Sequence, residues 1–351
     1  MRRRAHLVGS IPGASAAEAM EAALTRLAPY LLTLSDGETG ARAWWVGACI
    51  KNMQDNPDLE VAGGVRDFTD YENVLQFRLR DGAALQAANL EACLPYQAAF
   101  AGSYPTFVEL REKYDRPDLP FQVGIPGHLD LSLDAFGFGE GFAPHYYRPC
   151  LQATLSQVRE IAAAAASDVL FQLETPAALI AVAAAGEDAA AETARQVAAL
   201  ATELPAGAPA GTRFGVHLCL GDLNHKAMTG LKDITPAVLL ANELAAAWPS
   251  GRTLEFIHVP FAAAQEPPTF DDAFYQPLAK LDIPASVRFV AGCIHENLAS
   301  DQQVELLHLI ENHVGRDVDV AAACGLGRRP DVAQAWDAME KALLLVENDL
   351  A

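Results

Sequence analysis

Residues 213–219 have the sequence Arg213-Phe214-Gly215-Val216-His217-Leu218-Cys219, a short and mostly apolar segment that ends in an imidazole and a thiol. An apolar run of this length is typical of a buried strand in a parallel sheet. Alternate side chains of a strand point to the same face, so His217 and Cys219 face the same side. The segment therefore predicts a strand whose carboxyl end carries two metal-binding groups.

Similar strand-like segments recur along the chain, and Ala- and Leu-rich stretches of helical character lie between them. The predicted strands are His6–Ser10, Leu31–Asp36, Phe121–Ile125, Asp168–Glu174, Arg213–Cys219, Thr253–His258, Val287–Cys293 and Val318–Cys324. The predicted helices are Ala14–Leu27, with Ser15 as N-cap, and Gln152–Ala166, Ala177–Leu204, Pro236–Trp248, Gln302–Val314 and Pro330–Glu347.

This alternation predicts an α/β fold in which a parallel sheet is covered by helices. Eight such units predict one (β/α)8 TIM barrel that spans residues 1–351 as a single domain. An open doubly wound sheet is the alternative. No glycine-rich phosphate loop follows the first predicted strand to support a dinucleotide-binding fold.

One segment, residues ~52–118 between the second and third predicted strands, is too long for an ordinary connection. Its aromatic residues lie among helical stretches and include Tyr71, Phe77, Tyr96 and Phe107. We expect a helical insertion that covers the barrel mouth. A helical decoration with no role in the site is the alternative.

The composition of the chain excludes some partners. Its 25 basic and 45 acidic residues give a net charge of −20, which repels nucleic acids and anionic membrane surfaces. No apolar run approaches the ~20 residues that a membrane span needs. The six cysteines are widely spread, as in a reduced cytoplasmic protein rather than a disulfide framework. We therefore expect a cytoplasmic protein that acts on small molecules.

Nearly every predicted strand ends in, or is followed closely by, a side chain capable of chemistry. These side chains are Ser10, Asp36, Glu38, His128, Glu174, His217, Cys219, His258, His295 and Cys324. In a (β/α)8 barrel the carboxyl ends of the strands form the active site, so these residues are predicted to converge on one face. This placement is the main sequence evidence for an enzyme.

Three of these residues, His217, Cys219 and Cys324, form a candidate zinc site. Imidazole and thiolate groups are the ligands that zinc prefers, and Cys324 can reach the other two across the barrel mouth. Three protein ligands leave a fourth position open, as a catalytic zinc requires. The alternative is that both cysteines are small buried apolar side chains.

The loop after the second predicted strand and the loop after the last one carry further candidates. Asp36 and Glu38 could meet a cationic group of the substrate, while Trp44 lines the pocket; a helix cap with aromatic packing is the alternative. Arg328 and Arg329 lie where barrel enzymes often bind anionic groups, with a surface salt bridge as the alternative.

Five short motifs resemble those of the zinc-bearing C-terminal barrel in the cobalamin-independent methionine synthase family. They are Val8-Gly9-Ser10-Ile11-Pro12, Gln172-Leu173-Glu174-Thr175-Pro176-Ala177, His217-Leu218-Cys219, Cys293-Ile294-His295 and Cys324-Gly325-Leu326-Gly327-Arg328-Arg329. They follow the order of the family along most of the chain, and each lies at the end of a corresponding strand.

The resemblance implies a zinc-dependent methyl or alkyl transferase in which a zinc-bound thiolate attacks an alkyl donor. His217, Cys219 and Cys324 would be the zinc ligands, and His295 the catalytic histidine that protonates the leaving group or orients the donor. The candidate substrate-binding residues are Ser10, Asp36, Glu38, Glu174 and Trp44. The implied partners are a small-molecule thiol and an alkyl donor, with a corrinoid protein or a second copy of the chain as further candidates.

Two positions depart from the pattern of the family. His258 stands where the family has a zinc-binding glutamate, so it is a candidate fourth ligand, a residue that supports a ligand, or part of the pocket. Glu174-Thr175 replaces an Asp-Glu pair, which leaves one carboxylate there to meet an ammonium group. The acceptor thiol and the donor, whether folate, corrinoid or epoxide, therefore stay open.

Three other functions compete with this interpretation. One is another zinc-thiol alkyltransferase or lyase of the same superfamily. The second is a metal-free enzyme like uroporphyrinogen decarboxylase, which binds an anionic tetrapyrrole; this leaves His217, Cys219 and Cys324 without a purpose. The third is a non-catalytic zinc-binding barrel in which His258 closes a four-ligand shell.

Overall fold

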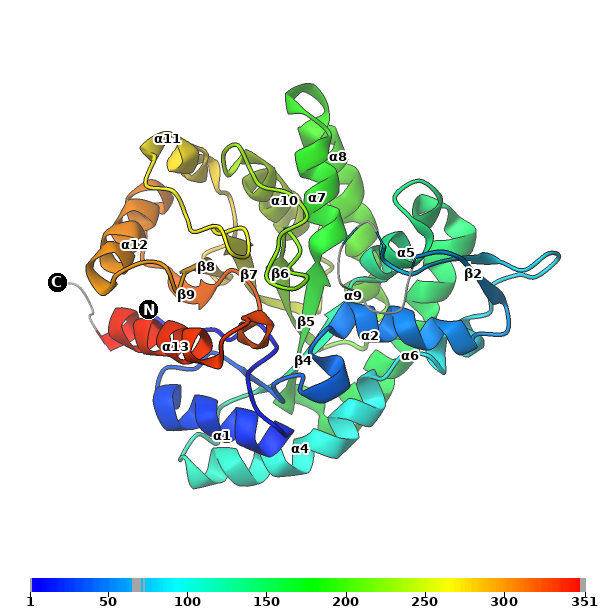
Figure 1. The fold of residues 1–351 in the computed structure, drawn as a ribbon, viewed down its shortest axis with the longest axis horizontal. Helices are drawn as coiled ribbons and strands as arrows, with labels where there is room; N and C mark the ends of the chain where they lie inside the picture. Colours follow the sequence, from blue (N-terminus) through cyan, green and yellow to red (C-terminus); the bar gives the residue numbers. More distant parts are fainter. Residues whose placement is uncertain (1, 65–70, 72, 348–351) are drawn as a thin grey trace.

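A curled sheet of seven parallel strands forms the centre of the protein, and the strand order follows the chain (Figure 1). The computed structural model describes residues 2–64, 71 and 73–347. The strands are β1 (Leu34–Ser35), β4 (Phe121–Pro126), β5 (Val169–Thr175), β6 (Arg213–Leu218), β7 (Thr253–Pro260), β8 (Arg288–Ile294) and β9 (Asp319–Ala322). Nearly all residues of β4 to β9 are buried, as expected for a parallel sheet that is covered by helices.

The N-terminal segment lies between β9 and the stretch that leads into β1. Ala5 forms isolated parallel bridges with both Leu31 and Val320, and the backbone N–H of His6 donates to the Val320 carbonyl at 2.9 Å. Residues 6–10, the predicted first strand, do not form a strand, and the two bridges of Ala5 lie just before them. The fold is TIM-barrel-like, but the sheet has seven strands and is not the closed eight-stranded barrel that the sequence predicts.

Long helices pack around the sheet close to the predicted positions. They are α1 (Ala16–Leu27), α6 (Pro144–Ala165), α7 (Pro176–Ala184), α8 (Glu187–Ala201), α10 (Thr235–Ala246), α12 (Ser300–Val314) and α13 (Val332–Glu347). Ser15 caps α1 by accepting a hydrogen bond from the backbone N–H of Glu18. The single helix predicted over residues 177–204 is broken, because Gly186 adopts a φ of +73° between α7 and α8.

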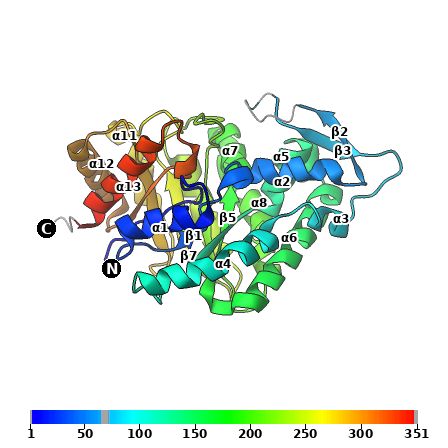
Figure 2. The same ribbon diagram turned by 60° about the horizontal axis from the view of Figure 1, so that its bottom comes forward.

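The segment between β1 and β4 is less helical than the sequence predicts. It contains α2 (Trp45–Asn52), the antiparallel hairpin of β2 (Leu59–Gly63) and β3 (Gln76–Leu79), and the helices α3 (Ala87–Glu91) and α4 (Tyr96–Lys113). Helix α4 packs against α1 and β4 and so belongs to the outer layer of the barrel. Figure 2 shows the hairpin at one end of the molecule, and β3 packs against α5 (His128–Phe136).

The remaining elements are short and connect the larger ones. They are the helices α9 (Glu203–Gly207) and α11 (Asp272–Tyr275) and the 3-10 helices at Gly40–Arg42, Met53–Asp55, Glu140–Phe142, Ala166–Asp168, Gln276–Lys280 and Leu326–Arg328. Among the helices of the described residues, none is long and apolar enough to cross a membrane.

The inside of the curled sheet is partly polar. A small apolar cluster of Val8, Leu170, Phe256, Val290 and Ala321 lies apart from the main core. Above it, buried side chains bond to one another and to the backbone: Nε2 of His6 lies 2.8 Å from Oε1 of Gln172. These bonds satisfy polar groups whose burial without a partner would cost free energy, and they hold the side chains beneath the strand ends in place.

Candidate functional site

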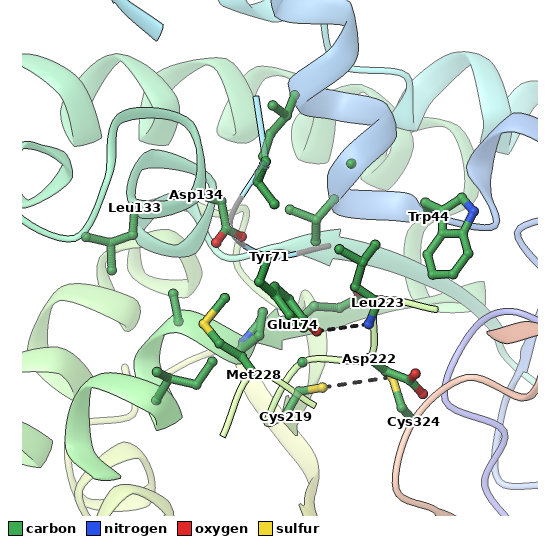
Figure 3. Close-up of a pocket in the computed structure, with 18 of the residues that line it drawn as sticks. Trp44, Tyr71, Leu133, Asp134, Glu174, Cys219, Asp222, Leu223, Met228 and Cys324 are labelled. Atoms are coloured by element: carbon green, nitrogen blue, oxygen red, sulfur yellow. Dashed lines mark hydrogen bonds between the residues drawn. The ribbon is translucent and has the colours of Figure 1, made fainter. Parts of the chain in front are cut away.

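A cavity of about 400 Å³ lies at the carboxyl ends of the strands (Figure 3). Glu174 of β5, His217 of β6 and Cys324 after β9 line its inner end. Residues of α2, of the segment between β2 and β3, and of α5 line the rest, and most of them are apolar. The cavity therefore occupies the position where barrel folds hold their active sites.

His217, Cys219 and Cys324 come together in this cavity as predicted. The two sulfur atoms lie 3.8 Å apart, and Nε2 of His217 lies 4.0 Å from Sγ of Cys324. All three ligand atoms lie within 4.8 Å of one another, so one metal ion could bind all of them. Because all three residues also line the cavity, a fourth coordination position would open into it.

The environment of Cys219 favours the protonated thiol. Hydrogen bonding with Cys324 and then burial raise the pKa of Cys219 well above its ordinary value. A bound cation reverses that effect, since a coordinating thiol is deprotonated outright. The donor set, two thiols and one neutral imidazole in a largely apolar setting, suits zinc.

His258 lies behind His217 and not in the cluster, so the structure does not support it as a fourth ligand. Its Nδ1 lies 2.8 Å from Nδ1 of His217, and its Nε2 lies 3.0 Å from the carbonyl of Ala322. Gly292 lies so close to the ring of His258 that it must lack a side chain, because a Cβ there would lie 2.6 Å from Nε2 of His258. Its contact with His217 matches one of the roles that the sequence left open, that of a residue that supports a candidate ligand.

These contacts fix the protonation of both rings. Burial, and then the neighbouring His258 and His6, lower the pKa of His217 well below its ordinary value, and burial lowers that of His258 to about 4. Both rings are therefore neutral, and the Ala322 carbonyl can only accept, so Nε2 of His258 carries its hydrogen. Nδ1 of His258 then accepts from Nδ1 of His217, which leaves a lone pair on Nε2 of His217, facing Cys324.

Two carboxyl groups, Glu174 and Glu38, lie side by side next to this cluster. Both would be within 3 Å of a Cβ at Gly124, at 2.9 Å and 2.7 Å respectively. Burial raises the pKa of Glu174 to about 7, although Arg328 opposes the rise; burial and then Glu174 raise that of Glu38 well above its ordinary range. Oε1 of Glu38 is buried without a hydrogen-bond partner among the described residues. The pair is therefore suited to accept an ammonium group.

Arg328 is the guanidinium of the cavity. It lies over the ring of Trp44, with 5.4 Å from its central carbon to the ring centre, and its Nη1 donates to the Asp222 carbonyl at 3.0 Å. Its Nε is buried without a partner among the described residues. Arg329 does not reach the cavity, because it pairs with buried Glu296 at 3.2 Å.

Ser10, Asp36 and Glu38 do not line the cavity, although the sequence places them among the substrate-binding candidates. Ser10 lies beneath the loop of Cys324, where its carbonyl accepts a hydrogen bond from Gly327 at 2.9 Å. Asp36 pairs with Arg42 and accepts a hydrogen bond from Ser103, so it holds the loop after β1 in place. Trp44 and Glu174 line the cavity as predicted.

His295, the predicted catalytic residue, is also not among the residues that line the cavity. Its Nε2 donates to the carbonyl of Ala264 at 3.0 Å, and its Nδ1 accepts from the backbone N–H of Asn297 at 3.1 Å. Both ring nitrogens are therefore used by the backbone. The residue follows its strand as predicted, but it does not line the cavity.

Four polar residues of the cavity, Tyr71, Gln76, Asp134 and Asp222, were not predicted from the sequence as site residues. Tyr71 accepts a hydrogen bond from the backbone N–H of Leu223 and donates to the carbonyl of Lys226. Asp222 lies in the loop after β6, and Asp134 lies on α5. The position of Asp222, three residues after Cys219, is the one signal in the sequence that could have indicated it.

Together, the fold and the cluster define a TIM-barrel-like protein that could hold a metal ion at the carboxyl ends of its strands. Comparisons of the sequence with models of known families and with curated proteins give no match. The structure is similar to that of a B12-independent methionine synthase from Shewanella sp. W3-18-1, solved in complex with selenomethionine. The TM-score is 0.59 with 12% sequence identity, over 100% of this chain and 99% of that one. The two proteins therefore share a fold.

Proposed function

We propose that this protein is a zinc-dependent methyl or alkyl transferase that acts on a thiol. One observation supports this most strongly: His217, Cys219 and Cys324 meet at a cavity, with the lone pair of His217 fixed toward them. A zinc ion there would keep a bound thiol deprotonated at neutral pH. The shared fold with a methionine synthase agrees with this chemistry.

The residues around the cluster would bind the acceptor. The carboxyl group of Glu174 in the cavity wall, with Glu38 next to it, would take an ammonium group, and the unpartnered Nε of Arg328 would take an anionic group. An aminothiol with a carboxylate has both. The apolar wall excludes water, so the thiolate sulfur attacks the alkyl carbon of the donor without competition from hydrolysis.

A closed structural zinc site is the second candidate, and the position of His258 argues against it. A structural zinc normally has four protein ligands. Among the described residues, only three have ligand atoms in the cluster, and both nitrogens of His258 are engaged elsewhere. An anionic tetrapyrrole ligand is also disfavoured, because Arg328 is the cavity's guanidinium and carboxyl groups surround it.

Metal content and thiol binding test the proposal. We expect about one zinc per chain, and Cys219→Ala or Cys324→Ala should remove it. Cys293→Ala is the matched control, because that cysteine is buried away from the cluster. Cobalt-substituted protein should change its visible spectrum when a thiol is added. The proposal fails if both cluster variants keep their zinc in the presence of a mild chelator, or if the spectrum of the cobalt-substituted protein does not change when a thiol is added.

A further inference from the structure

The charge of the cavity wall is dominated by carboxyl groups. Asp134, Glu174 and Asp222 line it, against the single guanidinium of Arg328 in the described part of the wall. Arg328 already lies over Trp44 and donates to the Asp222 backbone. Bringing a polyanionic ligand into such a space would place like charges together in a medium of low dielectric constant. The wall therefore favours cationic ligands.

Asp134 lies far from the residues assigned to the acceptor. Figure 3 shows its carboxylate on the opposite side of the cavity from Cys219 and Cys324. Its neighbours in the wall include the apolar side chains of Leu133 and Phe138. Nothing in the described part of the chain forms a hydrogen bond or ion pair with this carboxylate, and burial raises its pKa to about 7. An unpaired carboxylate at an apolar wall is costly unless a ligand cation pairs with it.

The hydrogen bonds of His295 agree with this conclusion. A methyl group on a neutral amine leaves only if its nitrogen gains a proton, and both nitrogens of His295 are bonded to the backbone. A methyl group on a sulfonium or quaternary ammonium centre needs no proton. Its leaving group departs as a neutral thioether or tertiary amine.

We infer that the alkyl donor is an onium compound, a sulfonium or quaternary ammonium cation, whose charged end is held by Asp134 and the apolar wall around it. The inference rests on the proposed transfer to a thiol. In the reaction, the acceptor thiolate attacks the methyl carbon of the donor. A sulfur–carbon bond forms while the bond from that carbon to the onium centre breaks, and its electron pair stays on the departing atom. The anion and the cation give two neutral products.

Binding of a non-reacting pair of probes tests this inference. Trimethylphenylammonium and tert-butylbenzene have nearly the same shape and differ in charge. We expect the cation to bind at least about tenfold more tightly than the neutral compound, in NMR or calorimetric titrations with and without metal. Asp134→Asn, which keeps the shape of the side chain, should remove most of this preference. Asp188→Asn, on an exposed position of α8, should leave it unchanged.

The outcomes separate this inference from the proposed function. Equal binding of the two probes, or a preference that Asp134→Asn leaves intact, overturns the onium donor even if zinc and thiol binding are normal. Conversely, a protein that keeps the charge preference but binds no zinc contradicts the proposed function. The transfer step is checked with dimethylphenylsulfonium and a thiol, which should give the methyl thioether and methyl phenyl sulfide. A bound sulfonium that never transfers would also overturn the inference.

Discussion

Nδ1 of His217 and Nδ1 of His258 lie 2.8 Å apart, and this contact determines which nitrogen of His217 faces the candidate metal site. The carbonyl of Ala322 sets the tautomer of His258, and His258 in turn sets that of His217. The order of the β6–β7–β8–β9 strands makes this possible, because His217 and His258 are register partners in β6 and β7. A buried hydrogen-bond chain of this kind typically orients a metal-bound imidazole.

Replacing His258 should therefore weaken metal binding without removing a ligand. In His258→Ala the imidazole is absent, so the hydrogen on Nδ1 of His217 loses its acceptor. We expect metal affinity to fall by roughly 10- to 100-fold, measured by competition with a chromogenic chelator. His308→Ala, on the exposed face of α12, is the control and should have no effect. Unchanged affinity in His258→Ala would show that the contact does not support the ligand.

The cluster that could hold a metal ion was predictable from the sequence because it depends on strand periodicity. His217 and Cys219 share a face through their spacing, and Cys324 follows a strand that ends at the same edge. The break in the helix predicted over residues 177–204 could not be predicted. Gly186 lies between alanine-rich stretches that favour helix, and the sequence does not show that its φ is positive. The hairpin of β2 and β3 was also missed within a segment that the sequence predicts as helical.

Side-chain direction outside the strands could not be predicted. The position of His295 after β8 is correct, but its ring direction depends on the carbonyl of Ala264, 31 residues away in the chain. Asp134 enters the cavity from a helix that the sequence does not reveal, since nearly all of α5 is buried and no polar face indicates its orientation. Such contacts depend on tertiary packing and leave no local pattern in the sequence.

Gly325 is a position where the backbone beside Cys324 has no room for a side chain. A Cβ there would collide with Oγ of Ser10 and lie 3.0 Å from its backbone nitrogen. We expect Gly325→Ala to displace Cys324, lower metal affinity at least about tenfold, and destabilise the protein by about 1–3 kcal/mol. Calorimetry and chelator competition measure the two effects. Gly230→Ala, where a Cβ meets open space, should change neither, and an intact site in Gly325→Ala would contradict this account.

Asp134 should make the protein less stable as the pH rises. Burial raises its pKa from 3.8 to about 7, so between these values the folded protein binds more protons than the unfolded chain. The free energy of unfolding therefore decreases as the pH increases through this window. Asp134→Asn removes this pH dependence. Between pH 5 and pH 8 the free energy of unfolding of the variant should therefore rise by about 1–2 kcal/mol relative to that of the parent, after allowance for the partial exposure of the side chain. Urea titrations at each pH measure the difference. A constant difference between the two proteins across this range would contradict the prediction.

Removing the metal should leave the fold intact. The three cluster residues lie at strand ends, and the large apolar core around the sheet does not depend on them. We expect the chelated protein to keep its far-UV circular dichroism spectrum and to lose only a few degrees of melting temperature. Unfolding on chelation would instead indicate a structural metal and argue against an open catalytic site.

His295 is the residue for which the sequence and the structure lead to opposite expectations. As a general acid, its removal would slow transfer by roughly 10²–10⁴-fold and leave stability unchanged. The structure instead has His295 hold Ala264, which adopts a φ of +53°, and the backbone of Asn297. We therefore expect His295→Asn to lose about 1–3 kcal/mol of stability, since the buried carbonyl of Ala264 loses its partner. Zinc content, thiol affinity and turnover per folded molecule should stay within about threefold of the parent. Melting curves and single-turnover rates on the same preparations distinguish the two roles. A slow but fully stable variant would restore the histidine as the proton donor, and would at the same time weaken the case for a donor that needs none.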